Sequence, residues 1–168
     1  MRTIPTLTTS RLVLRAFEQR DLDAYAPIMG DPEVTKHLGD GHPLSRDEAW
    51  RQMAVILGHW TLFGYGLWAV EERSTGALMG RIGCQQPEGW PGFELGYTLG
   101  RPFWGRGYAR EGAAAALTYA RDVLGRTSII SLIRPANAGS IRVAQSLGAA
   151  LDGEIEFFGG PTLVYRYG

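Results

Sequence analysis

The feature that most constrains this chain is a short segment in which two closely spaced glycines join an alternating apolar run to an alanine-rich stretch. The alternation over residues 93–99 predicts a strand, and residues 110–124 predict a helix. No Ser, Thr, Asp or Asn directly precedes that helix, so its first backbone N–H groups lack the usual side-chain cap. Gly105 and Gly107 have no Cβ, which lets a ligand approach the backbone closely. Because Arg106 and Arg110 add positive charge at this helix N-terminus, the segment predicts a phosphate-binding site.

The spacing of the glycines excludes two common nucleotide-binding loops. A dinucleotide fingerprint, G-x-G-x-x-G, requires a glycine where Arg110 stands. A Walker A loop would fit the spacing from Gly100 to Gly105. However, Arg106 and Gly107 replace its lysine and its magnesium-binding hydroxyl residue. The segment is therefore a phosphate loop of another class, or a plain connection between a strand and a helix.

Length, charge and cysteine content narrow the class of protein. The 168 residues predict a single domain, residues 1–168, that can bury a sizeable core. A net charge of zero removes any general attraction to nucleic acid or anionic lipid. Cys84 is the only cysteine, which excludes an internal disulfide and a cysteine-based metal site. Without a membrane-length apolar run or a signal-peptide pattern, the sequence predicts a cytoplasmic protein with no membrane, nucleic-acid or metal partner.

The remaining elements predict a mixed α/β sheet with helices on both faces. Strands are predicted at residues 11–15, 66–71, 77–84, 93–99, 127–133, 154–158 and 163–167, with a hairpin turn at Gly159 and Gly160. Helices are predicted from Asp21 to Met29, after the capping box Ser45–Glu48, from Arg110 to Leu124, and from Asn137 or Ser140 to Leu147. Asp21 is expected to cap the first helix.

Two motifs resemble one family. The loop Trp104-Gly105-Arg106-Gly107-Tyr108-Ala109 resembles the pyrophosphate loop of the GNAT acetyltransferase superfamily, [QR]-x-x-G-x-[GA], with Trp104 where many members have Gln or Arg. Residues 137–148 contain N-x-x-S-x-x-x-x-x-x-L-G, which resembles a second block of the branch that acetylates ribosomal-protein N-terminal alanines. Residues 9–15 and 31–34 are also similar to that branch. The resemblance spans the chain and implies a GNAT-like α+β fold, with a mostly antiparallel sheet of about seven strands and splayed central strands.

The resemblance also implies which residues contact acetyl-CoA. The strand that ends at Thr98 and Leu99 would offer backbone groups to the pantetheine arm, and the glycine loop would hold the phosphates. The implied contacts are Thr98, Leu99, Trp104, Gly105, Arg106, Gly107, Tyr108, Ala109, Asn137, Ser140 and Arg142. For Asn137 a helix N-cap is a compatible second role, and for Arg142 a solvated charge is the alternative.

The chemistry of such a site requires few groups. A thioester and an amine react directly when they are held together, so neither a metal nor a covalent nucleophile is needed. Glu94 is the first candidate for the general base, with a solvated edge carboxylate as the alternative; Glu71 and Glu72 are weaker candidates. Many GNAT enzymes have a tyrosine acid where this chain has Ala144. Ser140 inherits a role near the thiol by resemblance, with an ordinary helix hydroxyl as the alternative.

The sequence therefore predicts an acetyl-CoA-dependent N-acetyltransferase that acts on a peptide or protein N-terminal α-amine, or on a small amine. Ala144 keeps a non-catalytic acyl-CoA-binding or regulatory protein of the same fold as the alternative. The acceptor is expected near the first two helices and the neighbouring loops, whose aromatic side chains are candidates for core or ligand wall. These are His37, His59, Trp60, Phe63, Tyr65 and Trp68. The identity of the acceptor, the length of the acyl group and the choice between monomer and homodimer stay open.

Overall fold

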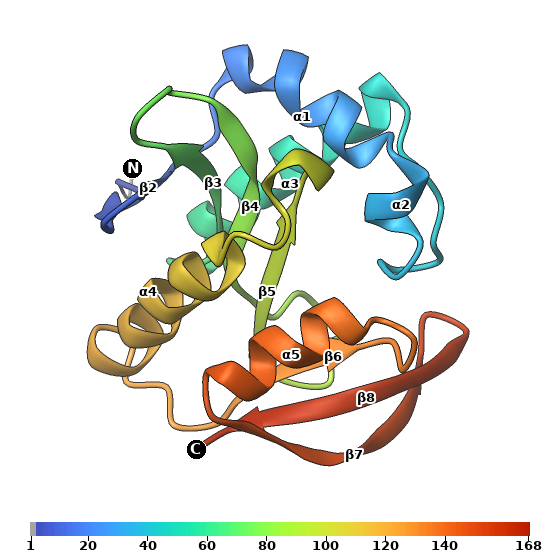
Figure 1. The fold of residues 1–168 in the computed structure, drawn as a ribbon. Helices are drawn as coiled ribbons and strands as arrows, with labels where there is room; N and C mark the ends of the chain where they lie inside the picture. Colours follow the sequence, from blue (N-terminus) through green and yellow to red (C-terminus); the bar gives the residue numbers. More distant parts are fainter. Residues whose placement is uncertain (1–2) are drawn as a thin grey trace.

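The computed structural model describes residues 3–168, which form one eight-stranded sheet flanked by helices (Figure 1). The strands follow the order β1-β2-β3-β4-β5-β6-β8-β7, and every neighbouring pair is antiparallel except β5 with β6. Their bounds are β1 Leu7–Thr8, β2 Leu12–Arg15, β3 Leu67–Glu72, β4 Leu78–Gln85, β5 Glu94–Leu99, β6 Ile129–Ile133, β7 Ala149–Phe157 and β8 Gly160–Tyr167. The expected mixed, mostly antiparallel sheet is confirmed, with the two-residue β1 as an additional strand.

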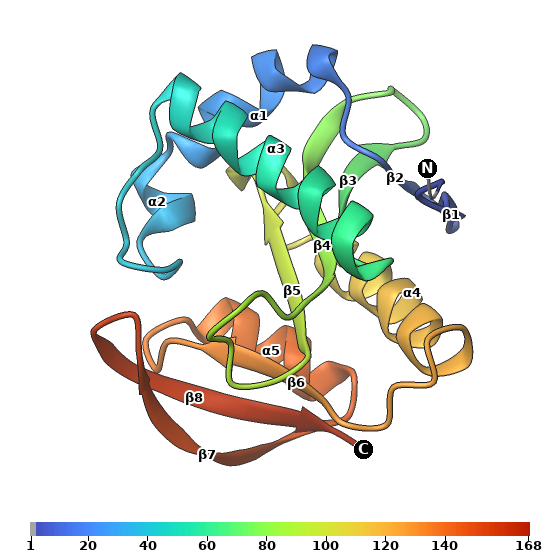
Figure 2. The ribbon, with the colours of Figure 1, turned by 180° about the vertical axis from the view of Figure 1, so that it is seen from behind.

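The helices cover both faces of the sheet. They are α1 Leu22–Met29, α2 Pro32–Thr35, α3 Arg46–Phe63, α4 Tyr108–Asp122 and α5 Ala138–Ser146. Helices α4 and α5 lie on the face turned toward the viewer in Figure 1, whereas α3 lies across the face seen in Figure 2. Helix α1 packs against α3 and β4. The strand β5 therefore has α4 and α5 on one side and α3 on the other.

The sheet opens between its two central strands. Within residues 3–168, β5 and β6 pair at a single register, Glu94 opposite Ile130, and the Ile130 N–H donates to the Phe93 carbonyl at 2.9 Å. Beyond this point the strands diverge. The Leu95 carbonyl accepts a hydrogen bond from the buried Ser131 hydroxyl at 2.6 Å. Because an unpaired buried carbonyl is costly, Ser131 stabilises the splay that the family resemblance implied.

Close packing holds α4 against the sheet. Its buried face consists of small residues, Gly112, Ala113, Ala116 and Ala120. A Cβ added at Gly112 would lie 2.6 Å from the Ile82 side chain of β4, which is closer than real atoms approach. The small residues therefore let the helix lie close to β4 and β5, and this fixes the position of its N-terminus beside the end of β5.

The helix starts differ in part from the sequence predictions. The capping box of Ser45 with Glu48 is confirmed, and Asn137, rather than Ser140, caps α5. The prediction that Asp21 caps α1 is wrong, because its carboxylate accepts hydrogen bonds from Arg15 Nη1 and Nη2 at 2.8 and 2.9 Å and makes no side-chain cap. A charged partner from β2 therefore outcompetes the backbone N–H groups. Helix α4 begins at Tyr108, two residues earlier than predicted.

Candidate active site

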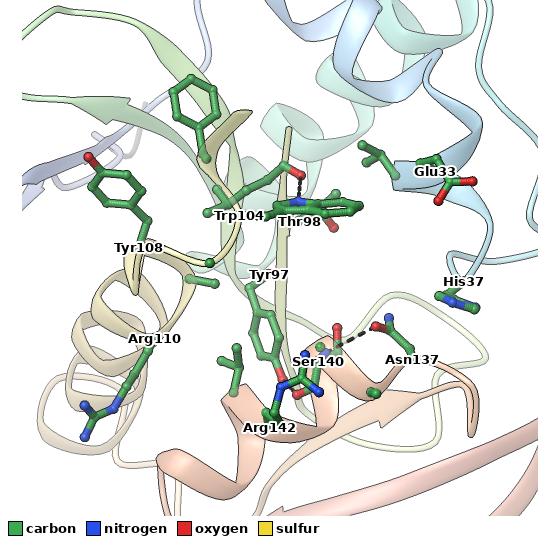
Figure 3. Close-up of a pocket in the computed structure, with 18 of the residues that line it drawn as sticks. Glu33, His37, Tyr97, Thr98, Trp104, Tyr108, Arg110, Asn137, Ser140 and Arg142 are labelled. Carbon is green, nitrogen blue, oxygen red and sulfur yellow. Dashed lines mark hydrogen bonds between the residues drawn. The ribbon is translucent and has the colours of Figure 1, made fainter. Parts of the chain in front are cut away.

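A cleft of about 590 Å³ lies between the end of β5, the N-terminus of α4 and α5 (Figure 3). The sequence-predicted coenzyme A contacts that line it are Thr98, Leu99, Trp104, Gly105, Gly107, Tyr108, Ala109, Asn137, Ser140 and Arg142. Arg106 lies on the same loop, but its side chain is not part of the lining. The structure therefore brings together residues from three segments that are distant in sequence.

The N-terminus of α4 faces this cleft without a side-chain cap. Gly107 occupies the N-cap position with φ of 79°, and Gly105 has φ of 71°. Both values lie in the left-handed region, which residues with a Cβ adopt only with strain. The loop can therefore turn tightly and leave the first N–H groups of α4 available to an anion.

The side chains of Arg106 and Tyr108 brace the loop from its outer side. The Tyr108 ring lies between two guanidinium groups, with its centroid 4.3 Å from Arg11 and 4.9 Å from Arg106. Its hydroxyl donates to Glu72 Oε1 at 2.6 Å, and Arg11 Nη1 donates to the Arg106 carbonyl at 2.9 Å. These contacts engage Glu72, and Glu71 accepts from Arg15 Nε at 2.9 Å. Neither of the weaker base candidates lines the cleft.

Unpaired positive charge at the cleft comes from Arg110 and Arg142, since Lys36 is paired with Glu33. Both arginines are lining residues, and within the described part of the chain neither side chain has a hydrogen bond or an ion pair. Together with the uncapped helix N-terminus, they form a surface that fits a polyphosphate. The residues present thus fit the phosphates of coenzyme A.

Trp104 and Asn137 shape the rest of this cleft. The Trp104 indole N–H donates to the Leu99 carbonyl at 2.7 Å, so one backbone group of β5 is already engaged (Figure 3). Asn137 Oδ1 accepts from the Ser140 N–H at 3.2 Å while its side chain lines the cleft, so the cap and the wall position coexist.

A second cavity, of about 570 Å³, lies on the α3 side of the sheet. It is lined by residues from β4, β5, β6 and the β7–β8 hairpin. The two cavities share the residues that surround the splay, namely His37, Leu38, Tyr97, Thr98, Asn137 and Ser140. A molecule in one cavity therefore meets a molecule in the other beside the splay.

Glu94 lies in the second cavity and is 9% exposed. Its Oε2 accepts hydrogen bonds from Trp90 Nε1 at 2.6 Å and from Gln85 Nε2 at 3.0 Å. Burial raises the pKa of this carboxyl above its usual value, and the two hydrogen bonds act in the opposite direction. Glu94 is thus a buried, positioned carboxylate, and the alternative of a solvated edge carboxylate is wrong.

Tyr97 is a site residue that the sequence analysis missed. Its ring lines both cavities, and its hydroxyl donates to the Ser140 carbonyl at 2.7 Å. Burial strongly raises the pKa of this phenol. The alternation of β5 is the signal that could have found it, because Tyr97 must point to the face opposite Glu94. Ala144 is fully buried and lines neither cavity.

The aromatic residues expected near the acceptor divide into core and wall. Trp60, Tyr65 and Trp68 are buried in the core, and His37 lines both cavities. Both ring nitrogens of His59 are engaged, one with the Tyr65 carbonyl at 2.7 Å and one with the Gln86 N–H at 3.2 Å. Besides His37, His42 and Tyr97, the aromatic residues that line the second cavity are Trp90, Phe157 and Phe158.

Comparison with known proteins identifies the family. Two cavities that meet at a splayed strand suit an enzyme that transfers a group between two bound substrates. A family model described as "Acetyltransferase (GNAT) domain" matches residues 11–150, and the chain belongs to this family of acetyl-CoA-dependent N-acetyltransferases. The chain is 33% identical over 165 residues to YkkB of Bacillus subtilis, covering 95% of this chain and 94% of that protein.

Solved structures agree with this assignment. An acetyltransferase from Agrobacterium tumefaciens superposes with a TM-score of 0.88 at 34% identity, over 100% of this chain and 96% of that one. RimL, described as a ribosomal L7/L12 α-N-protein acetyltransferase in complex with coenzyme A, superposes with a TM-score of 0.78 over 98% and 97% of the two chains. At 18% identity this second likeness shows the fold alone. Within residues 3–168, no helix has the length and apolar character that crossing a membrane requires.

Proposed function

We propose that the chain transfers the acetyl group of acetyl-CoA to a primary amine by direct attack in a ternary complex. The amine is a peptide or protein N-terminal α-amine, or a small amine. The observation that carries this proposal is the pair of cavities on opposite sides of β5 that share Tyr97, Thr98, Asn137 and Ser140. Two substrates held in this way gain their rate mainly from proximity and orientation.

The first cavity supports binding of coenzyme A. The N-terminus of α4 would hold the pyrophosphate through backbone N–H groups, so Tyr108 contributes its amide rather than its engaged hydroxyl. Trp104 forms a wall beside the pantetheine arm, since its indole already occupies the Leu99 carbonyl. The proposed contacts are Thr98, Leu99, Trp104, Gly105, Arg106, Gly107, Tyr108, Ala109, Asn137, Ser140 and Arg142.

The chemistry needs one proton acceptor and one proton donor. Bound acetyl-CoA supplies a thioester; the amine nitrogen bonds to its carbonyl carbon, the C–S bond breaks, and the thiolate leaves. Glu94 accepts the proton that the ammonium loses when it becomes the attacking amine, and its raised pKa makes it a stronger base than an exposed glutamate. Ser140 lies where both cavities meet and donates a proton to the departing sulfur.

A thiol-release assay with acetyl-CoA tests this proposal. The acceptors are peptides with free N-termini, the same peptides with blocked N-termini, and small primary amines. We expect release that depends on a free amine, and a product whose mass increases by one acetyl group. Acetyl-CoA binding in calorimetry without acceptor-dependent release would contradict the proposal and favour the non-catalytic alternative.

A further inference from the structure

An arginine side chain that has no hydrogen bond or ion pair within the protein is a candidate for binding an anion from a ligand. Within residues 3–168, the guanidinium groups with neither a hydrogen bond nor an ion pair belong to Arg81, Arg106, Arg110, Arg126 and Arg142. Those of Arg106 and Arg126 lie over aromatic rings, and Arg110 and Arg142 line the coenzyme A cleft. Arg81 alone in this set lines the second cavity.

Among the described residues, no carboxylate makes a hydrogen bond or an ion pair with Arg81. Its charge acts on Glu94 only through space, where it lowers the pKa of that carboxyl. Arg81 Nε is buried from solvent and has no hydrogen-bond partner among the described residues. Tyr25 is the nearby titratable group on α1; burial raises the pKa of its phenol, and its hydroxyl donates to Gln52 Oε1 at 2.6 Å. A polar N–H that is buried without a hydrogen-bond partner is costly, and here that group is the Nε of a half-buried arginine. The arrangement is stabilised if a ligand brings an anionic hydrogen-bond acceptor.

The register of the sheet places Arg81 and Glu94 on the same face. Arg81 pairs with Thr98 on β5, and Gln85 pairs with Glu94, so side chains at these positions point into the second cavity. Between the two pairs lies the pair Gly83 and Gly96, which carries no side chain. The strand separates the two ends by about 13 Å between Cα atoms, at ~3.3 Å per residue. The cavity therefore has Arg81 and Glu94 at opposite ends of a floor formed by two glycines. A second arginine, Arg134, also lines the cavity, but its guanidinium already donates to backbone carbonyls and to the Thr162 hydroxyl.

Glu94 does not neutralise Arg81 directly. Its Oε2 is held by Trp90 and Gln85, at the far end of the shared face. The other carboxylate that lines the cavity, Asp40, accepts a hydrogen bond from the His42 N–H at 3.0 Å and has no ion pair with Arg81. The two charged ends are thus free to bind opposite charges of a single molecule.

We propose that Arg81 binds a carboxylate of the acceptor, so that the preferred substrate carries a primary amine and a carboxylate in one molecule. This inference rests on the proposed function, because it assigns the second cavity to the acceptor. The guanidinium offers several N–H donors in one plane, which suits a carboxylate better than a single carbonyl. Arg81 thereby sets specificity and orients the amine toward the splay.

The test compares amino acids with their amides. Glycine, β-alanine and 4-aminobutyrate are assayed beside glycinamide, β-alaninamide and 4-aminobutyramide, which keep the amine and replace the carboxylate by a neutral group. For at least one chain length, kcat/KM for the acid should exceed that for the amide by about tenfold or more, as expected for a hydrogen bond to a charged group. Equal values for all three pairs in the unaltered protein would overturn the inference.

Variants separate recognition from a structural role. Arg81→Met and Arg81→Gln should remove the preference for the acid and leave the amides within about twofold, and Arg81→Lys should restore part of it. Arg51→Gln, which removes an exposed charge from α3, should leave the preference unchanged. If Arg81→Met and Arg81→Gln lower acid and amide rates equally, Arg81 acts on folding or on Glu94, and the inference is wrong.

Equilibrium binding keeps this inference separate from the proposed function. Calorimetry measures binding of each acid and amide to the protein saturated with coenzyme A, a complex that cannot turn over. Arg81-dependent binding of the acids without acetylation would support the carboxylate site and contradict the proposed transfer. Acetylation of the amines without any Arg81-dependent binding would support the proposed transfer and contradict the carboxylate site.

Discussion

The two cavities that meet at β5 are constructed from different parts of the chain. The coenzyme A cleft takes its central feature from one contiguous segment, in which the glycine loop leads directly into α4. The second cavity combines side chains from β4, β5 and the β7–β8 hairpin, which the sheet topology brings together. Under the proposed function, backbone groups recognise the common substrate, whereas dispersed side chains recognise the variable one.

The two cavities also differ in charge. The first combines a helix N-terminus with Arg110 and Arg142, which suits a ligand with several negative charges. The second is lined by two arginines, Arg81 and Arg134, and by two carboxylates, Asp40 and Glu94, with Arg81 and Glu94 at opposite ends. A family can therefore keep the first arrangement and change the acceptor by substituting a few positions in the second. Variants at Glu94, Ser140, Gly107 and Arg142 test this division between the two cavities.

Glu94→Gln should have the largest effect, and it acts on the second cavity. We expect turnover to fall by about a hundredfold near neutral pH, within the range of general-base catalysis. The loss should be greatest between the pKa of Glu94 and the amine's pKa of about 8, because in that range the amine is protonated while the carboxylate can still accept its proton. At high pH the amine is already free, and the loss should shrink. Rates at saturating acetyl-CoA across the pH range measure this.

The pH profile also reports the pKa of Glu94. Burial raises that pKa, so the unaltered enzyme should lose activity at a higher pH, as the pH falls, than an exposed glutamate would allow. The Trp90 hydrogen bond lowers the pKa, and Trp90→Phe should therefore shift the acidic limb further upward. A loss in Glu94→Gln that is equal at every pH would indicate a structural role for the carboxylate.

Ser140→Ala should have the next largest effect and acts where the cavities meet. The thiolate leaves without help more easily than an alkoxide, since a free thiol has a pKa of about 8.5. We therefore expect the rate to fall by roughly tenfold to a hundredfold, the lower part of the range for general acids. Coenzyme A affinity should stay within a few-fold, and Ser140→Thr should recover part of the rate. Lost affinity with an unchanged saturated rate would make Ser140 a cofactor contact instead.

Much of the fold could be predicted because its signals are local. Hydrophobic periodicity predicted most strands, and the capping box of Ser45 with Glu48 predicted the start of α3. Elements without such a signal were missed, namely the two-residue β1 and the four-residue α2. Asp21 carried a correct local signal and still failed as a cap, because Arg15 offers a stronger partner. Tertiary contacts of this kind are absent from any short window of sequence.

In the candidate site, too, features formed by adjacent residues could be predicted, whereas features formed by residues distant in sequence could not. The glycine loop could be predicted because its donors are backbone groups of adjacent residues. Arg81 carried no sequence signal, since only the register of β4 with β5 reveals that it shares a face with Glu94. Trp90 could not be predicted as a partner of Glu94 because its orientation depends on a loop. The acceptor site therefore required the structure.

Gly107→Ala tests the backbone character of the first cavity. Gly107 and Gly125 are both left-handed glycines at opposite ends of α4, with φ of 79° and 64°. An added Cβ should strain either position by a similar amount, roughly 1–2 kcal/mol. Only Gly107→Ala should also weaken coenzyme A binding, by about tenfold, because relieving the strain at this N-cap displaces the first N–H groups of α4, which face the cleft. Calorimetry and thermal unfolding of both variants measure this. Equal coenzyme A affinities of the two variants would show that the loop is not part of the binding site.

Arg142→Gln should have the smallest effect, since the side chain is exposed and its attraction to a phosphate is screened by water. An exposed ion pair contributes about 0.2–1 kcal/mol, so coenzyme A affinity should fall by no more than about fivefold. The difference from the unaltered protein should vanish at high salt, and it should be absent for pantetheine, which lacks the phosphates. Arg51→Gln on α3 removes an equally exposed charge from the other face and should change neither affinity. An equal loss for pantetheine would show that Arg142 supports the shape of α5, and the electrostatic contrast between the two cavities would then rest on α4 and Arg110.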